Sequence, residues 1–263
     1  MNSTTRVAVI TGASQGIGRR TAEVLAGKGY ALALNDIQGL EGSLQAVRQV
    51  GAEAIEAPGD VASESDVDRI ARTVEEHYGR VDVLVNNAGI SFIRPAEETG
   101  AAEWRRVIEV NLTGPFLLCR AFGRIMLRQG EGAIVNVASV AGLAGIGDRA
   151  AYNASKHGLI GLTRTLASEW GGRGVRTNAV CPGWVKTEMD EADQAGGYYS
   201  DSDIENRVPM GRFARPNEIA EAIAFLADPK LSGFVNGMEL RVDGGWLADG
   251  SWDKLRVTHR RAG

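Results

Sequence analysis

Near the N-terminus, an apolar run leads directly into a glycine-rich turn, and this stretch limits the possible folds more than any other. Val7–Ile10 consists of apolar residues, as in a parallel strand that is buried on both faces. It runs into Thr11–Gly18, after which apolar residues recur at helical spacing. In such a corner Gly12 permits the tight turn, Gly16 lets the backbone approach a pyrophosphate, and Gly18 allows close packing of helix on strand. Three glycines alone are weak evidence, but their position between a strand and a helix predicts a phosphate-binding corner.

Strand-like and helical segments alternate along the rest of the chain. The runs expected to form further strands are 31–34, 52–57, 81–85, 132–137, 175–180 and 234–242. Helical patterns cover 40–50, 67–74, 103–129 (interrupted at 111–115), 152–170 and 216–226. This alternation predicts an α/β fold, with a Rossmann-type doubly wound parallel sheet in a single domain over residues 1–263.

Composition and charge exclude several classes of function. The formal net charge of −4 and the pI near 5.5 argue against nucleic acid as a main partner. Cys119 and Cys181 lack metal-ligand spacing, so we expect free buried thiols and no metal site. Residues 1–7 lack an apolar leader and no run of about 18 apolar residues follows, so we expect a cytoplasmic protein without a membrane span.

An acidic residue follows the second predicted strand. Asp36 can bind the adenosine ribose hydroxyls of a dinucleotide, and its charge repels a 2′-phosphate. No basic residue follows in 37–39, and Arg19 and Arg20 are expected to face solvent from the first helix. An ordinary strand-end turn residue is the alternative. Together with the glycine-rich corner, Asp36 favours NAD over NADP as the cofactor.

Tyr152 and Lys156 are four positions apart, which places them on one face of a helix. At about 4 Å and an effective dielectric of about 20, the ammonium would favour the phenolate by roughly 4 kcal/mol and lower the tyrosine pKa toward the range of a general acid or base. Alone, such a pair is more often part of a solvated helix face. Ser139, after a predicted strand, is either a cap or a donor to a substrate oxygen. Pro115 lacks the N–H that would bond to the Asn111 carbonyl, which marks either an open carbonyl for a water or a plain helix kink.

These motifs, in this order, resemble the short-chain dehydrogenase/reductase family over the whole chain. The residues that carry the resemblance are Thr11-Gly12, Gly16-Ile17-Gly18, Asn86-Asn87-Ala88-Gly89, Asn111, Ser139, Tyr152, Lys156 and Pro182-Gly183. The resemblance implies a catalytic group of Asn111, Ser139, Tyr152 and Lys156. In that group Tyr152 exchanges the hydroxyl proton, Ser139 holds the substrate oxygen and Lys156 stabilises the phenolate.

The resemblance also implies the residues that contact the cofactor. They lie in the glycine-rich loop, at the strand ends and after Pro182: Gly12, Ser14, Gln15, Gly16, Ile17, Gly18, Asp36, Asp60, Val61, Asn87, Ala88, Gly89, Tyr152, Lys156, Pro182, Gly183, Val185 and Thr187. Within this set, Asp60 and Val61 would meet the adenine, and Val185 and Thr187 the nicotinamide carboxamide.

Residues 189–211 are polar and acidic without clear periodicity, which predicts a substrate lid. Either its carboxylates face solvent, or they disfavour an anionic substrate while Trp184, Tyr198 and Tyr199 contact a neutral polyhydroxy compound. We therefore predict hydride transfer between NAD(H) and a secondary alcohol or ketone, with a small-molecule substrate such as a sugar, polyol or other neutral alcohol.

Several alternatives stay open. A 3-oxoacyl-thioester reductase matches the same core motifs. An enzyme of another class on this fold would have a larger C-terminal region or lack the glycine loop and the lysine, and a non-catalytic NAD-binding protein would not need the intact catalytic group. From the resemblance we expect a homotetramer, which the apolar residues Phe116, Leu117, Phe122 and Leu166 support. The tail 251–263 is expected to be a surface arm, and His77, His157 and His259 to be surface residues.

Overall fold

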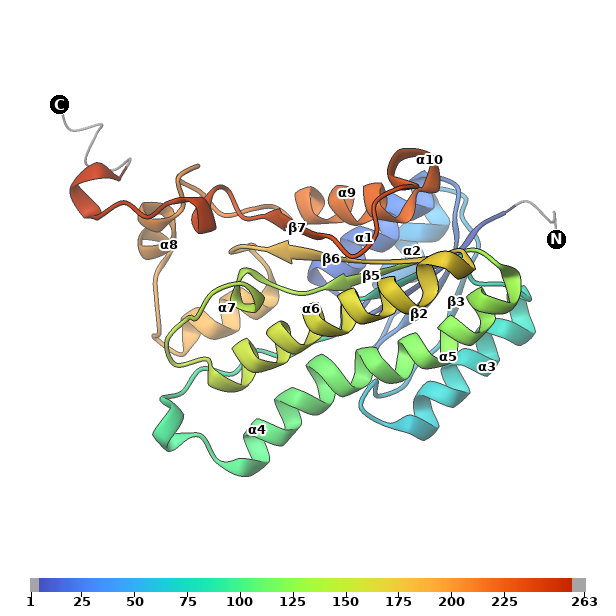
Figure 1. Cartoon of the computed structure of the whole chain (residues 1–263), viewed down its shortest axis with the longest axis horizontal. Helices are drawn as coiled ribbons and strands as arrows, with labels where there is room; N and C mark the ends of the chain where they lie inside the picture. The colour runs from blue at the N-terminus through green and yellow to red at the C-terminus, as the bar shows by residue number, and fades with distance from the viewer. Residues whose placement is uncertain (1–4, 257–263) are drawn as a thin grey trace.

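The computed structural model describes residues 5–256, which form one seven-stranded parallel sheet with the order β3-β2-β1-β4-β5-β6-β7 (Figure 1). Its strands are β1 (Val7–Thr11), β2 (Ala31–Asn35), β3 (Ala54–Glu56), β4 (Val83–Asn86), β5 (Gly132–Val137), β6 (Val175–Pro182) and β7 (Glu239–Val242). The chain winds outward from β1 to β3 and then in the opposite direction from β4 to β7. This order confirms the predicted Rossmann-type α/β fold and places the switch point between β1 and β4, where such sheets bind ligands.

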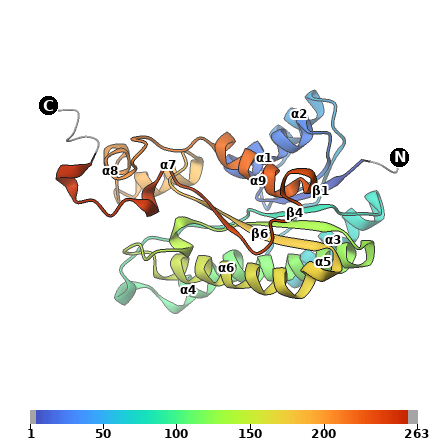
Figure 2. The ribbon, with the colours of Figure 1, turned by 45° about the horizontal axis from the view of Figure 1, so that its top comes forward.

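Helices cover both faces of the sheet (Figures 1 and 2). One face carries α1 (Gly16–Gly27), α2 (Glu41–Gln49), α9 (Pro216–Ala227) and the short α10 (Pro229–Ser232); the other carries α3 (Glu64–Tyr78), α4 (Ala101–Ile108), α5 (Gly114–Gln129) and α6 (Ala150–Trp170). Short 3₁₀ turns lie at Ala96–Glu98, Val140–Gly142, Gly171–Arg173, Trp246–Ala248 and Asp253–Leu255.

Alternate residues of the central strands enter two separate cores. In β1, Ala8 and Ile10 pack with the residues of α1 and α9, whereas Val9 packs on the opposite side with those of α3 and α5. Leu32 and Ala33 of β2 divide in the same way. A sheet buried on both faces therefore explains why these strands are apolar up to their last residues, Thr11 and Asn35.

The predicted helix 103–129 is interrupted, but not by a simple proline kink. A π-helical turn, Glu109–Thr113, joins α4 to α5, and the Gly114 N–H donates to the carbonyl of Glu109 instead of the one a residue later. Pro115 follows in the first turn of α5, where its missing N–H is tolerated. A lone proline predicts a break in the helix, but it does not predict a wider turn.

Two further segments differ from the sequence expectation. The region 189–211 is largely helical: it contains α7 (Glu188–Ala195) and α8 (Asp201–Arg207). These helices bury little, Asp190 in α7 and Ile204 in α8, so they leave no apolar periodicity in the sequence. The last strand spans Glu239–Val242 rather than 234–242, because Gly237 turns the chain with a φ of 77° just before it.

Figures 1 and 2 place α7 and α8 at the end of the molecule opposite the N-terminus, next to the C-terminal segment. Arg207 of α8 contacts the C-terminal segment through an ion pair with Asp249 at 3.2 Å. Trp252 is 70% exposed, as expected for a surface arm, whereas 257–263, with His259, lie outside the described residues. Within residues 5–256, no helix is long and apolar enough to cross a membrane. His77 and His157 are exposed, as predicted.

Candidate active site

The glycine-rich corner lies between β1 and α1 and is built on close backbone contacts. Gly12 and Gly16 have positive φ angles of 63° and 54°. A Cβ atom on Gly18 would lie 2.0 Å from the carbonyl oxygen of Gly12, so a larger residue would force the helix away from the strand. The side-chain amide of Asn87, just after β4, donates to the carbonyls of Thr11 and Gly12 at 2.9 and 3.0 Å. The corner is thus fixed to the end of β4, at the switch point of the sheet.

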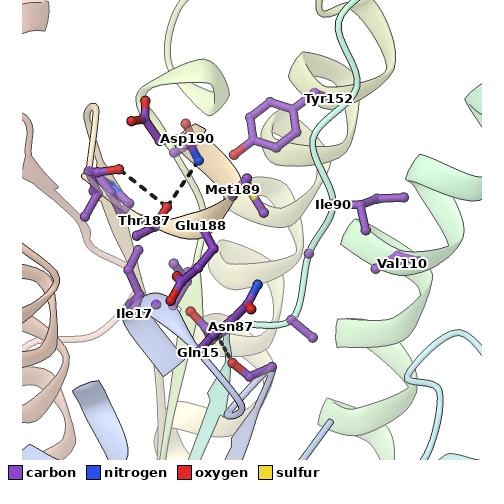
Figure 3. A pocket seen from close by; sticks show the side chains of 18 of the residues that line it. Gln15, Ile17, Asn87, Ile90, Val110, Tyr152, Thr187, Glu188, Met189 and Asp190 are labelled. Carbon is purple, nitrogen blue, oxygen red and sulfur yellow. Dashed lines mark hydrogen bonds between the residues drawn. The ribbon is translucent and has the colours of Figure 1, made fainter. Parts of the chain in front are cut away.

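One cavity of about 310 Å³ runs along this edge of the sheet. All the predicted site residues line it except Gly18, which packs behind the loop, and Asn111. Figure 3 shows Asn87, Gln15 and Ile17 at one side of the cavity and Tyr152 at the other, with Glu188 pointing from α7 toward the glycine-rich loop.

The corner suits the phosphates and adenosine of a nicotinamide dinucleotide. The hydroxyl oxygen of Ser14 is buried and has no hydrogen-bond partner among residues 5–256, so it is available to a ligand phosphate. Asp36 accepts hydrogen bonds from the backbone N–H groups of Ser14 at 3.0 Å and Ile37 at 2.8 Å, which fix its carboxylate at the end of β2. Asp60 also lines this end, and Arg106 pairs with it at 3.1 Å. The described residues therefore fit the cofactor that the sequence suggests.

Tyr152, Lys156 and Ser139 meet at the other end of the cavity. Tyr152 and Lys156 project from α6, with the Lys156 Nζ atom 5.5 Å from the centroid of the Tyr152 ring. The Lys156 ammonium is buried and donates to the carbonyl of Val137 at 2.8 Å. Ser139 follows β5 and caps the next turn, accepting from the Ala141 N–H at 3.1 Å. The last residues of β5 thus place a hydroxyl and a lysine-binding carbonyl beside the tyrosine.

Burial governs the ionisation of this pair, and one expectation is wrong. Desolvation raises the pKa of Tyr152, although a hydrogen bond to Ser139 and the charge of Arg149 lower it. Desolvation also lowers the pKa of Lys156, to about 8. The expected net lowering of the tyrosine pKa by a nearby ammonium omits the cost of burying both groups, and for Tyr152 this cost is the larger effect.

Asn111 lies in the π-helical turn, and its side chain serves the framework. Its Oδ1 atom accepts from the Ile90 N–H at 2.9 Å, and its Nδ2 atom donates to the Ile90 carbonyl at 3.0 Å and to Ser155 at 3.3 Å. The side chain therefore joins the loop after β4 to α6, one residue before Lys156. A role for the Asn111 carbonyl, which the missing N–H of Pro115 suggests, stays a prediction.

The predicted lid, residues 189–211, is not one acidic surface, because its carboxylates differ in burial and in their partners. Asp190 is buried, pairs with Lys186 at 3.3 Å and accepts from the Tyr199 hydroxyl at 2.8 Å. Tyr199 and Trp184 line the cavity, whereas Tyr198 is 54% exposed and lies outside the cavity in which a substrate contact is expected.

Other acids of the lid face solvent. Glu191 and Glu205 are exposed, in agreement with the alternative in which the lid carboxylates are solvated.

One functional residue of the cavity is absent from the sequence prediction. Arg149 lines the cavity three residues before Tyr152. The signal in the sequence that could have identified Arg149 is a basic residue close to the catalytic Tyr152.

The chain matches known proteins over most of its length. A family model described as enoyl-(acyl carrier protein) reductase matches residues 12–247. D-threitol dehydrogenase of Mycolicibacterium smegmatis is 41% identical over 92% of each chain, and 3-oxoacyl-[acyl-carrier-protein] reductase of Synechocystis is 39% identical over 93% of this chain and 98% of its own.

Among solved structures, a protein of Beutenbergia cavernae provisionally described as an NAD(P)-dependent gluconate 5-dehydrogenase, with bound NADP at low occupancy, is 41% identical. The match has a TM-score of 0.87 over 94% of this chain and 99% of the other. The fold and the matched sequence define an oxidoreductase that acts on alcohol or keto groups. The chain belongs to the short-chain dehydrogenase/reductase family.

Proposed function

We propose that this protein transfers a hydride between NAD(H) and a secondary alcohol or ketone, and that its substrate is a small neutral alcohol such as a sugar or polyol. The observation that carries the proposal is the single cavity, which has Asp36 at one end and Ser139, Tyr152 and Lys156 at the other. A bound nicotinamide dinucleotide supplies the hydride acceptor. The glycine-rich loop, Asp36 and the residues after Pro182 would hold it.

The protein's own residues handle the proton. In the oxidative direction Tyr152 takes the proton of the substrate hydroxyl, and Ser139 donates to the substrate oxygen. Lys156 would stabilise the phenolate and bind the ribose of the cofactor, and a water held by the Asn111 carbonyl would link Lys156 to solvent. The raised pKa of Tyr152 in the protein alone means that oxidation accelerates with rising pH, because the base must first lose its proton.

Tyr152→Phe tests the assignment of the base. We expect turnover to fall by at least about 100-fold, the range of a lost general base, while NAD still binds. Absorbance of NADH measures turnover, and tryptophan fluorescence measures binding. Tyr198→Phe is the matched control, because that exposed side chain lies outside the cavity. Substantial activity in Tyr152→Phe would contradict the assignment.

The substrate class is tested with a panel of sugars, polyols, other neutral alcohols and hydroxy acids, with acetoacetyl thioester in the reductive direction. A 3-oxoacyl-thioester reductase is the second candidate, favoured by the relative of that name. Strong turnover of the thioester with none for any polyol or sugar would select it. Binding of NAD without turnover of any compound would favour a non-catalytic NAD-binding protein.

A further inference from the structure

Arg149 lies at the substrate end of the cavity, immediately before α6, with its guanidinium carbon 5.9 Å from the centroid of the Tyr152 ring. Its Nη2 atom donates to Oδ2 of Asp193 at 3.0 Å, and its Nη1 atom donates to the Ser91 hydroxyl at 2.9 Å. Ser91 donates to the same Asp193 oxygen at 2.9 Å. The three side chains, here called the Arg149 cluster, join α6, the lid helix α7 and the loop after β4.

The backbone before Arg149 is held in an unusual conformation. Asp148 has a φ of 58°, and no other non-glycine residue of 5–256 has a positive φ. Its carbonyl accepts from the Arg94 N–H at 2.7 Å. A left-handed conformation in a residue other than glycine persists where the surroundings hold it, and such residues gather at functional sites. The position of Arg149 is therefore fixed by the loop as well as by its ion pair.

The charges of this end of the cavity are compensated inside the protein. The side chains of Arg149 and Asp193 are 12% and 16% exposed, so their ion pair is largely removed from water. A guanidinium stays charged in proteins, and removing one partner of a buried pair leaves the other charge uncompensated. The buried lid carboxylate of Asp190 has its own cation in Lys186. In this arrangement the charge of Arg149 is neutralised by Asp193 of the lid helix α7.

We propose that Asp193 determines the charge selectivity of the site: it is the internal counterion of Arg149, and it makes the site select neutral alcohols over carboxylate-bearing ones. Without its charge, Arg149 binds a substrate carboxylate, for which the fork of a guanidinium is well suited. An acidic substrate must otherwise compete with a carboxylate that the chain itself holds in place. The inference rests on the proposed function, because it takes the cavity beside Tyr152 as the place where the alcohol binds.

The test compares threitol with threonate, which differ in one terminal group, CH₂OH against COO⁻. In Asp193→Asn, an isosteric change that removes the charge, we expect the threonate-to-threitol ratio of kcat/KM to rise at least about tenfold. Using the ratio cancels changes in proton transfer by Tyr152, since both substrates share that step. The double variant Asp193→Asn/Arg149→Met should lose the gain. Glu191→Gln, an exposed charge removal on the same helix, should leave the ratio within about twofold.

A ratio unchanged in Asp193→Asn, or a wild-type protein that already prefers threonate, would overturn the inference. A binding measurement separates it from the proposed function. Calorimetry of threonate with the enzyme–NADH complex, in which no oxidation occurs, should show at least about tenfold tighter binding in Asp193→Asn than in the wild type. If no neutral alcohol of the panel is turned over, the proposed substrate class fails; tighter threonate binding in Asp193→Asn then still supports the role of Asp193, and unchanged binding rejects it.

Discussion

Asp36 is the residue on which the proposed choice between NAD and NADP depends. Backbone N–H groups of Ser14 and Ile37 hold its carboxylate at the end of β2, so it does not swing away from a ligand. A 2′-phosphate placed beside it would lack a partner, at a cost of about 2 kcal/mol, or about 30-fold in affinity. We expect NAD to be preferred by at least that factor in kcat/KM.

Asp36→Asn keeps the shape of the side chain without its charge, and Asp36→Ala removes both. Each should shrink the preference for NAD, as measured by steady-state kinetics with both cofactors. Glu56→Gln is the matched control, because this exposed acid ends the neighbouring strand β3 outside the cavity. Equal kcat/KM for NAD and NADP in the wild type would show that Asp36 does not select the cofactor.

Lys156 gives the stability of the fold a pH dependence. Burial lowers its pKa to about 8 in the folded protein, against 10.5 for a lysine in water. Between these values the unfolded chain binds more protons at this position than the folded protein, so its contribution to the free energy of unfolding rises with pH. Below pH 8 the lysine is charged in both states and the burial penalty is constant. The whole change corresponds to about 3 kcal/mol.

Lys156→Met removes this contribution. We expect the stability of the wild type relative to the variant to increase by up to about 3 kcal/mol between pH 8 and 10.5, measured by urea unfolding. The difference cancels ionisations that the two proteins share. Lys230→Met, on the exposed α10, should show no such trend. If the stability difference between the two proteins does not change across this range, the pKa of Lys156 in the folded protein is not lowered by burial.

At the scale of elements, the strands and long helices follow from the sequence because each buries a regular apolar pattern. The predicted runs at β1, β2, β5 and β6 became strands, because apolar residues dominate strands that are covered on both faces of the sheet. Buried polar residues such as Asn136 of β5 and Asn178 of β6 interrupt these runs without obscuring them. The lid helices α7 and α8 could not be predicted in this way, because they are held mainly by polar contacts between residues 9 to 15 positions apart in the sequence.

The same distinction applies to the candidate site. Residues whose role depends on local spacing, such as Gly12, Gly18 and the pair Tyr152 and Lys156, could be placed from the sequence. The pairing of Arg149 with Asp193 could not, because these residues are 44 positions apart and meet only in the folded chain.

The lid should open more readily than the helices of the core. α7 and α8 bury little apolar surface and are held by the Lys186–Asp201 pair at 2.6 Å, whereas α6 has buried residues along most of its length. Local opening requires little free energy where few apolar contacts are lost. We expect amides of α7 and α8 to exchange at least about 100-fold faster than those of α6 in hydrogen-exchange measurements.

Lys186→Met should accelerate exchange in α7 and α8 and leave α6 unchanged, so that α6 serves as the internal reference. Adding NAD with a substrate or product analogue should slow exchange in the lid, as expected of a segment that closes over the site. Equal protection of the lid and α6 in the free protein would contradict a mobile lid.

At the scale of the whole molecule, two areas with exposed apolar side chains could support assembly, one on α5 and one formed by α10 and the segment that leads to β7. Of the residues expected to support assembly, Leu117, Phe122 and Leu166 are buried within the chain, and Phe116 of α5 is 45% exposed. In the second area Leu231 lies on α10, and Phe234 and Met238 lie between α10 and β7; all three are exposed. A tetramer with twofold axes requires two distinct interfaces, each self-complementary, and these two areas are the candidates.

We therefore propose a homotetramer, and expect light scattering at micromolar concentration to give four times the chain mass of 28.0 kDa. Phe116→Glu and Phe234→Glu should each reduce the assembly to dimers, because a charge placed in one interface leaves the other intact. Val50→Glu, at a 58% exposed position outside both areas, is the control and should remain tetrameric. A wild-type protein that scatters as a monomer would refute the assembly. The double variant Phe116→Glu/Phe234→Glu should be a monomer, and if it remains a dimer, at least one interface lies elsewhere.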